Sequence, residues 1–185
     1  MTEIVYYVAS SLDGLIAPED GSPAWLAPFE SSGIDYGYAD FYDSIDAVIV
    51  GARTYEQALT FAEWPYPGKP TWVMSSRDLP AAALDVTVTG ASPLVVWTQL
   101  ERLGVRRAWL VGGGALAGAF QTVGLITEYQ ISFMPVLLGS GVSLLGERGV
   151  PAVLDLISSR TYPDGVVQGT YRCMATLSTP EEVDG

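Results

Sequence analysis

The segment from residue 107 to residue 125 constrains the fold of this 185-residue chain more than any other stretch. The apolar run 108–111 is typical of a short buried strand, three glycines follow at 112–114, and a helix-like run then stops at Gly124. A strand that leads through glycines into a helix is how α/β folds present backbone N–H groups to an anion, and a Cβ there would hold a phosphate away. We therefore predict a phosphate-binding turn. The alternative is a tight turn without a ligand, because short glycine motifs are weak evidence.

Apolar runs elsewhere alternate between strand and helix patterns. Strands are predicted at 4–9, 47–50, 71–74, 86–89 and 127–134, and helices at 35–45, 54–61 and 93–103, with Thr54 and Gln57 spaced as a capping box. Two further strands, 154–162 and 166–177, flank the turn signal Pro-Asp-Gly. This order predicts a three-layer αβα fold with a mostly parallel central sheet and an antiparallel C-terminal hairpin at one edge. We expect a single domain over 1–178 and a frayed acidic tail over 179–185.

The charge balance and the missing residue types exclude several classes of function. The formal net charge is −12, and the nine cationic side chains include one lysine, Lys69, so binding to nucleic acid or to a membrane surface is not expected. The chain has no histidine and one cysteine, Cys173, which excludes a Ser-His-Asp triad and makes a metal site unexpected. Because neither a disulfide framework nor a signal-peptide pattern is present, we expect a cytoplasmic protein. Its chemistry has to come from carboxylates, hydroxyls, backbone groups and a borrowed cofactor.

Three loops follow predicted strands directly, at 51–54, 75–77 and 112–114. In open α/β sheets ligands bind outside the carboxyl ends of the strands, so we expect these loops to form one site. The long segment 18–33 carries Trp25, Leu26 and Phe29. Long loops inside compact domains usually have a function, and we predict a functional loop here.

These loops, in this order and spacing, resemble the dihydrofolate reductase-like superfamily, and most closely the reductase domain of riboflavin biosynthesis proteins. The resemblance covers residues 4–177. It rests on Ser-Leu-Asp-Gly-Leu-Ile-Ala at 11–17, Val-Gly-Ala-Arg-Thr-Tyr-Glu at 50–56, Ser-Ser-Arg at 75–77, Val-Gly-Gly-Gly at 111–114 and Pro-Val-Leu-Leu-Gly-Ser-Gly at 135–141. It implies a nicotinamide-dependent reductase of a small heterocycle. It also implies a homodimer, with the late antiparallel strands as the expected contact.

The resemblance further implies a cofactor site for NADPH, with NADH not excluded. The three glycines would meet the pyrophosphate, with a cis peptide bond between Gly112 and Gly113. The Ser-Ser-Arg loop would surround the adenosine ribose and its 2′-phosphate, and segment 18–33 would cover the hydride-transfer site. Ala52 stands where the family pattern has arginine, which would weaken the preference for NADPH unless Arg77 compensates. The expected cofactor-binding residues are Ala17, Gly51, Arg53, Thr54, Ser75, Ser76, Arg77, Val111, Gly112, Gly113, Gly114 and Ala115.

Asp35 is the candidate catalytic and substrate-binding residue. Hydride delivery to a C=N or C=O bond needs a proton source, and Asp35 lies sixteen residues before Gly51, which matches the spacing of the pterin-binding carboxylate in dihydrofolate reductases. The alternative is an acid that stabilises the first turn of a helix. Trp25 either packs on the substrate or anchors its loop in the core.

The substrate is left open between two candidates. The motif at 11–17 favours the ribosylaminopyrimidine phosphate reduced in riboflavin biosynthesis, by 5-amino-6-(5-phosphoribosylamino)uracil reductase, whereas Asp35 favours dihydrofolate. The zinc ligands of a deaminase domain are missing, so we expect a stand-alone reductase whose substrate could be neither. A nucleotide-binding or dimerisation module without turnover is the alternative from another class, favoured by Ala52 and by the shortage of cations.

Overall fold

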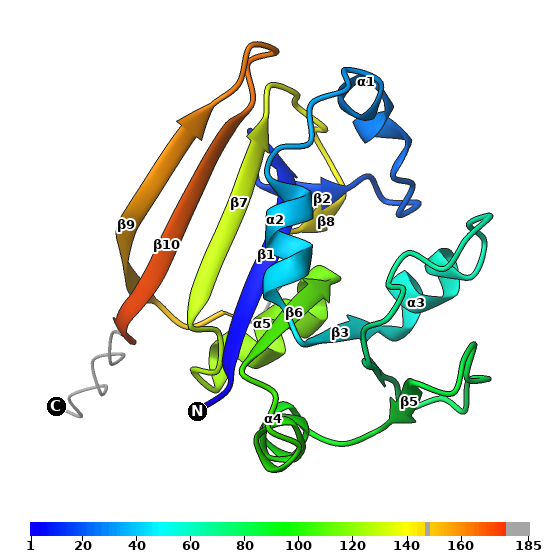
Figure 1. Ribbon diagram of the computed structural model, residues 1–185. Coiled ribbons are helices and arrows are strands. Elements are labelled where there is room, and N and C mark those ends of the chain that lie inside the picture. Colours follow the sequence, from blue (N-terminus) through cyan, green and yellow to red (C-terminus); the bar gives the residue numbers. More distant parts are fainter. Residues whose placement is uncertain (147–148, 177–185) are drawn as a thin grey trace, which may run out of the picture.

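The computed structural model describes residues 1–146 and 149–176, which are built around a central sheet (Figure 1). Within these residues the sheet has eight strands in the spatial order β5-β4-β3-β6-β1-β7-β10-β9. Neighbours from β5 to β7 are parallel, whereas β10 runs antiparallel to β7, and β9 antiparallel to β10. The strands are β1 (Glu3–Ser11), β3 (Ala47–Gly51), β4 (Thr71–Met74), β5 (Val86–Thr89), β6 (Arg107–Gly112), β7 (Glu128–Met134), β9 (Ala152–Thr161) and β10 (Val167–Thr176).

Helices cover both faces of this sheet, which confirms the predicted αβα layers. The helices are α2 (Tyr38–Ser44) and α3 (Ala52–Ala58) on one face, and α4 (Pro93–Arg102) and α5 (Gly114–Thr122) on the other. On β1, Ile4 and Tyr6 pack with α4 and α5, and Val5 packs with α2 and α3, because alternate side chains of a strand point to opposite faces. No helix in the described part of the chain combines the length and the apolar character needed to cross a membrane.

The structure corrects the predicted starts of two helices. Gly51, not Thr54, is the N-cap of α3, and no side chain caps this helix, so the predicted capping box is wrong. The reason is that β3 runs directly into α3, which places Thr54 already in the first turn. Helix α2 begins at Tyr38 rather than at residue 35, because Tyr36 and Gly37 have positive φ angles of 54° and 78° that interrupt a helix.

Segment 18–33 is more ordered than the predicted loop. It contains the 3₁₀ helix η1 (Ala24–Leu26) and the short helix α1 (Ala27–Glu30), with proline in the first turn of α1, where its missing N–H costs nothing. A small sheet of β2 (Leu15–Ala17) and β8 (Val142–Ser143) was also not predicted. The predicted domain boundary at 178 and the tail at 179–185 lie outside the described residues.

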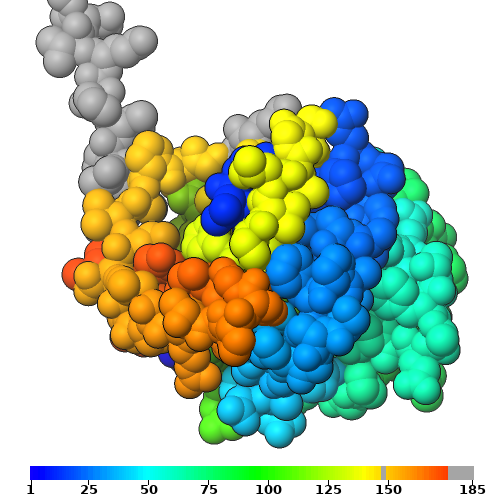
Figure 2. Space-filling view, turned by 90° about the horizontal axis from the view of Figure 1, so that it is seen from above, coloured from blue at the N-terminus to red at the C-terminus, as the bar shows by residue number. Residues whose placement is uncertain are grey.

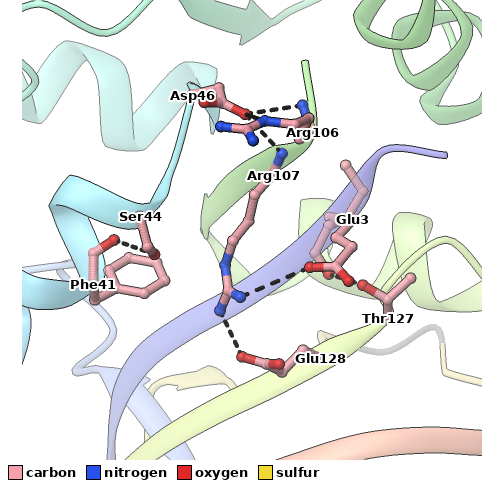
Figure 3. A network of polar contacts seen from close by, with 9 residues as sticks. Glu3, Phe41, Ser44, Asp46, Arg106, Arg107, Thr127 and Glu128 are labelled. Atoms are coloured by element: carbon pink, nitrogen blue, oxygen red, sulfur yellow. Dashed lines mark hydrogen bonds and ion pairs between the residues drawn. The ribbon is translucent and has the colours of Figure 1, made fainter. Parts of the chain in front are cut away.

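A polar network joins the amino ends of four neighbouring strands (Figure 3). The Asp46 carboxylate accepts the backbone N–H groups of Arg106 and Arg107 at 2.9 and 3.1 Å. The Arg107 guanidinium donates to Glu128 at 2.7 Å and lies 3.7 Å from Glu3. Two of the nine cationic side chains are therefore located at the opposite end of the sheet from the three predicted ligand loops.

Candidate functional site

A cavity of about 950 Å³ opens near the carboxyl ends of β1, β3, β4 and β6. It brings together most of the expected cofactor-binding residues, namely Ala17, Gly51, Arg53, Thr54, Val111, Gly113, Gly114 and Ala115. Gly112 is not part of its lining, and neither are Ser75, Ser76 and Arg77, which follow the lining residue Met74 at the rim. Two of the three predicted loops, 51–54 and 112–114, therefore meet at the cavity, and the third, 75–77, lies at its rim, as expected for strands whose carboxyl ends are adjacent.

Two helices begin on the same wall of the cavity. Gly51 is the N-cap of α3 and Gly113 is the N-cap of α5, and neither helix start is capped by a side chain. The two positions are close, because a Cβ built on Gly51 would lie 3.5 Å from the carbonyl oxygen of Gly112 and 3.7 Å from the nitrogen of Gly113. The first-turn N–H groups of a helix have no partner within the helix and attract anions. The cis peptide bond expected between Gly112 and Gly113 is present.

The three glycines have different surroundings, and their contact with a pyrophosphate stays a prediction. A Cβ on Gly114 would lie 2.0 Å from the carbonyl oxygen of Ser143, so this glycine allows α5 to pack against β8. Gly112 has a φ of 112°, which favours glycine. A Cβ on Gly113 would meet its nearest neighbour, Thr54 Oγ1, at an ordinary 3.8 Å. Gly113, with a φ of −71°, is therefore the one of the three glycines where a Cβ could be added without a close contact or backbone strain.

The motifs at 11–17 and 135–141 meet in space and hold the strand that carries Ala17. The Asp13 carboxylate accepts the Ser11 hydroxyl at 2.6 Å and the backbone N–H groups of Leu138 and Gly139 at 3.1 and 2.7 Å. These hydrogen bonds, that from Ser11 foremost, lower the pKa of Asp13 to about 2. Seen from the carboxyl ends of the strands, the yellow segment around 135–146 lies beside the blue segment around 18–33 (Figure 2).

Segment 18–33 closes one side of the cavity and is held at both of its ends. Near its start, Gln57 Nε2 donates to the carbonyl oxygen of Gly21 at 3.1 Å, which ties the segment to α3. Farther along, Phe29 is buried in a cluster with Met134 and Val166. Trp25 packs against this cluster and is not part of the cavity lining, so in this structure it anchors the segment in the core. Its indole N–H is buried without an acceptor among the described residues.

Asp35 lies outside the cavity lining. Its side chain is exposed, and its Oδ2 accepts the backbone N–H of Ala39 at 3.1 Å at the start of α2. The pKa of Tyr7 is raised to about 12, first by burial and then by the nearby Tyr162 and Asp35. Tyr7 and the cavity-lining Ala9 lie two residues apart on the same face of β1, and the ring of Tyr38, three residues after Asp35, lies 6.3 Å from the ring of Tyr7.

An ion pair occupies the rim where β4 ends. Arg77 donates from Nη1 and Nη2 to the two carboxylate oxygens of Glu56 at 2.9 and 2.8 Å. The hydrogen bonds from Arg77, with a smaller contribution from Arg53, lower the pKa of Glu56. Ser75 Oγ also accepts the backbone N–H of Arg77 at 2.9 Å and so shapes the turn. In the described part of the chain, Arg53 has no carboxylate within 4.0 Å.

Sequence reasoning missed several lining residues, among them Gln57, Met74 and Val142. Gln57 lies one helical turn after Arg53, so the spacing on α3 could have indicated it. Met74 ends a predicted strand, which is where ligands bind in such sheets. No local signal indicates Val142, because its place depends on the pairing of β8 with β2.

Comparison with known proteins agrees with this architecture. The family model described as the RibD C-terminal domain matches residues 2–168. The chain is 38% identical over 163 residues to the uncharacterized protein YwjB of Bacillus subtilis, covering 88% of this chain and 93% of YwjB. It is 30% identical over 171 residues to the riboflavin biosynthesis protein RibD of Mycobacterium tuberculosis, covering 85% of this chain and 49% of RibD, about half of its length.

Among solved structures, a Shewanella sp. PV-4 protein named for riboflavin biosynthesis superposes with a TM-score of 0.82 at 30% identity. The match covers 95% of this chain and all of that one. The chain therefore belongs to the RibD C-terminal domain family and has the dihydrofolate reductase-like fold of that family.

Proposed function

We propose that this protein is a cytoplasmic reductase that transfers a hydride from a nicotinamide cofactor to a small heterocycle. NADPH is the first candidate for the cofactor and NADH the second. The observation that carries the proposal is the cavity in which the starts of α3 and α5 share one wall. Membership of the RibD C-terminal domain family supports a reductase. The free Cys173 is compatible with a reducing compartment.

The residues of the cavity fit a dinucleotide. A volume of about 950 Å³ is at the upper end of the usual range for small-molecule sites, roughly 300–1,000 Å³. Backbone N–H groups at Gly113 and Ala115 would hold the pyrophosphate, and Arg53 adds one positive charge at the same wall. Such an arrangement suits a chain with few cations, because main-chain amides replace side-chain charges. The bound nicotinamide would supply the hydride.

The two ends of the cavity differ in chemistry. Ala9, Ala17 and Leu26 line the end near β1, under segment 18–33, and they present apolar surface. The other end lies at Met74, beside the charged rim of Arg77 and Glu56. Hydride transfer is favoured where water is excluded, so we assign the nicotinamide to the end near β1 and the adenosine to the end at β4.

We further propose that Asp35 binds the polar edge of the substrate and supplies the proton. Its support is that Asp35 is joined to Tyr38 by a backbone hydrogen bond of 3.0 Å, and the ring of Tyr38 lies 6.3 Å from that of Tyr7, two residues before the cavity-lining Ala9 on β1. Replacing Asp35 with asparagine is expected to lower turnover while leaving cofactor affinity unchanged. Asp40→Asn on α2 is the matched control. Equal turnover in both variants would remove Asp35 from the mechanism.

The cofactor proposal is tested by thermal unfolding with NADPH and with NADH. At a hundredfold excess over Kd, binding stabilises the folded state by about 2.7 kcal/mol, which raises the melting temperature measurably. Gly113→Ala is expected to melt like the unmodified protein but to lose at least about tenfold in cofactor affinity, because its Cβ would separate the backbone from the pyrophosphate.

The same samples are then assayed for cofactor oxidation with the riboflavin-pathway pyrimidine and with dihydrofolate. Oxidation dependent on either compound identifies the substrate. The absence of any thermal shift with either cofactor would contradict the reductase. Cofactor binding without oxidation of any offered heterocycle would favour a nucleotide-binding module.

We also propose a homodimer formed through β9, an edge strand of the sheet. Leu154 and Leu156 are 38% and 56% exposed, and they lie opposite Cys173 and Tyr171, which pack against the main core. The apolar face of the sheet therefore continues to an open edge, which favours pairing with a second copy. Sedimentation is expected to give twice the 19.7 kDa chain mass. Leu156→Lys is expected to give the monomer, whereas Leu84→Lys, a change at an exposed leucine elsewhere, leaves the dimer intact.

A further inference from the structure

The rim at the end of β4 carries the cations that a phosphate on the adenosine ribose could use. Among the described residues, Arg53 lines the cavity and Arg77 lies at its rim. Arg106 and Arg107 lie at the opposite end of the sheet, and Lys69 donates to the carbonyl oxygen of Ile45 at 2.6 Å. Among the described residues, Arg53 and Arg77 therefore supply guanidinium groups at this rim.

One of these two groups is already engaged by a carboxylate. The Arg77 guanidinium presents its two terminal nitrogens to Glu56, at 2.9 and 2.8 Å, which is the paired geometry that it would offer to a phosphate. Both side chains are more than one-third exposed, 58% for Arg77 and 42% for Glu56, so a ligand can reach the pair.

The ion pair lies next to the cavity lining in the chain, and neither of its residues is itself part of the lining. Glu56 lies on α3 between the lining residues Arg53 and Gln57, and Arg77 follows the lining residue Met74 by three positions. The contribution of Arg53 to the lowered pKa of Glu56 also brings the carboxylate into the electrostatic range of the cavity wall. A ligand group that reaches this rim therefore meets a carboxylate as well as two guanidinium groups.

We infer that Glu56 is a specificity-determining residue that weakens discrimination in favour of NADPH over NADH. The inference rests on the proposed function and on the assignment of the adenosine to the β4 end. A ribose diol can donate hydrogen bonds to the Glu56 carboxylate, whereas a 2′-phosphate has only acceptors there, is repelled by the carboxylate, and has to displace it from Arg77. Glu56 therefore favours the cofactor that lacks the 2′-phosphate.

The test is the affinity of each cofactor for the intact chain and for Glu56→Gln, measured by isothermal titration calorimetry. Glu56→Gln is expected to raise the NADPH-to-NADH affinity ratio by at least about tenfold, because the repulsion is removed and Arg77 becomes available. Glu63→Gln is the matched control, because it removes the same charge from an exposed position after α3. Its NADPH-to-NADH affinity ratio is expected to equal that of the unmodified protein. The melting temperature without cofactor is expected to change little in either variant, because exposed ion pairs contribute little to stability.

A second variant separates the role of Arg77. In the Glu56→Gln background, Arg77→Gln is expected to lower NADPH affinity and to leave NADH affinity unchanged. If Glu56→Gln binds each cofactor but its NADPH-to-NADH affinity ratio is that of the unmodified protein, this inference is overturned and the reductase proposal stands. A failure of both cofactors to bind the unmodified protein would overturn the proposed function, and this inference with it.

Discussion

Gly114→Ala is expected to lower the free energy of unfolding by about 3 kcal/mol, because the added Cβ has no room in the packed start of α5. It would lie 2.0 Å from the carbonyl oxygen of Ser143 and 3.1 Å from the nitrogen of Gly146. Both are backbone atoms that no side-chain rotation can move away, so β8 has to shift. For a chain of this length the loss corresponds to a decrease of roughly 6–12 °C in melting temperature.

Thermal and urea unfolding of the chain without cofactor measure this effect. The matched control is Gly113→Ala at the preceding position, where the Cβ would meet Thr54 Oγ1 at 3.8 Å, and its melting temperature is expected to stay that of the unmodified protein. If the two variants were equally stable, the close contact between α5 and β8 would not exist in solution.

Gly141→Ala is expected to lower the free energy of unfolding by about 3–5 kcal/mol, because it adds backbone strain to a steric clash. Gly141 has a φ of 152°, and a Cβ on it would lie 2.1 Å from the carbonyl oxygen of Ala17 and 2.9 Å from Cα of Pro18. Since Ala17 lines the cavity and Pro18 begins its covering segment, the clash also reaches the site. We therefore expect cofactor affinity to fall together with stability.

Gly139→Ala in the same loop measures how much of the loss in unfolding free energy is due to backbone strain alone. Gly139 also has a positive φ, 77°, but nothing lies within 4 Å of its Cβ position, so a loss of about 1–2 kcal/mol is expected with cofactor affinity retained. Urea unfolding and cofactor titration of the two variants provide the measurement. Equal losses in the two variants would contradict the contact between the loop and Ala17.

Much of the fold and part of the candidate site followed from local patterns in the sequence. The strands at 71–74 and 86–89 were predicted with the bounds that the structure has, because buried strands are marked by apolar residues within a few positions. The order of strands, helices and the final hairpin is also a local property, and it predicted the sheet and its layers. The loops at 51–54 and 112–114 could be placed at one cavity because both follow neighbouring parallel strands.

What the sequence by itself determined is, to within a few residues, where the eight strands of the main sheet and helices α2 to α5 form, and at which edge of the sheet the predicted ligand loops lie. Only the tertiary structure decided that Gly114 is required by Ser143, that Arg77 is held by Glu56, and that the Asp35 carboxylate accepts a hydrogen bond at the start of α2. The physical reason is that periodicity and turn residues record the burial and backbone angles of neighbouring positions. Contacts between distant segments depend instead on how the completed elements pack, and no local pattern encodes that packing.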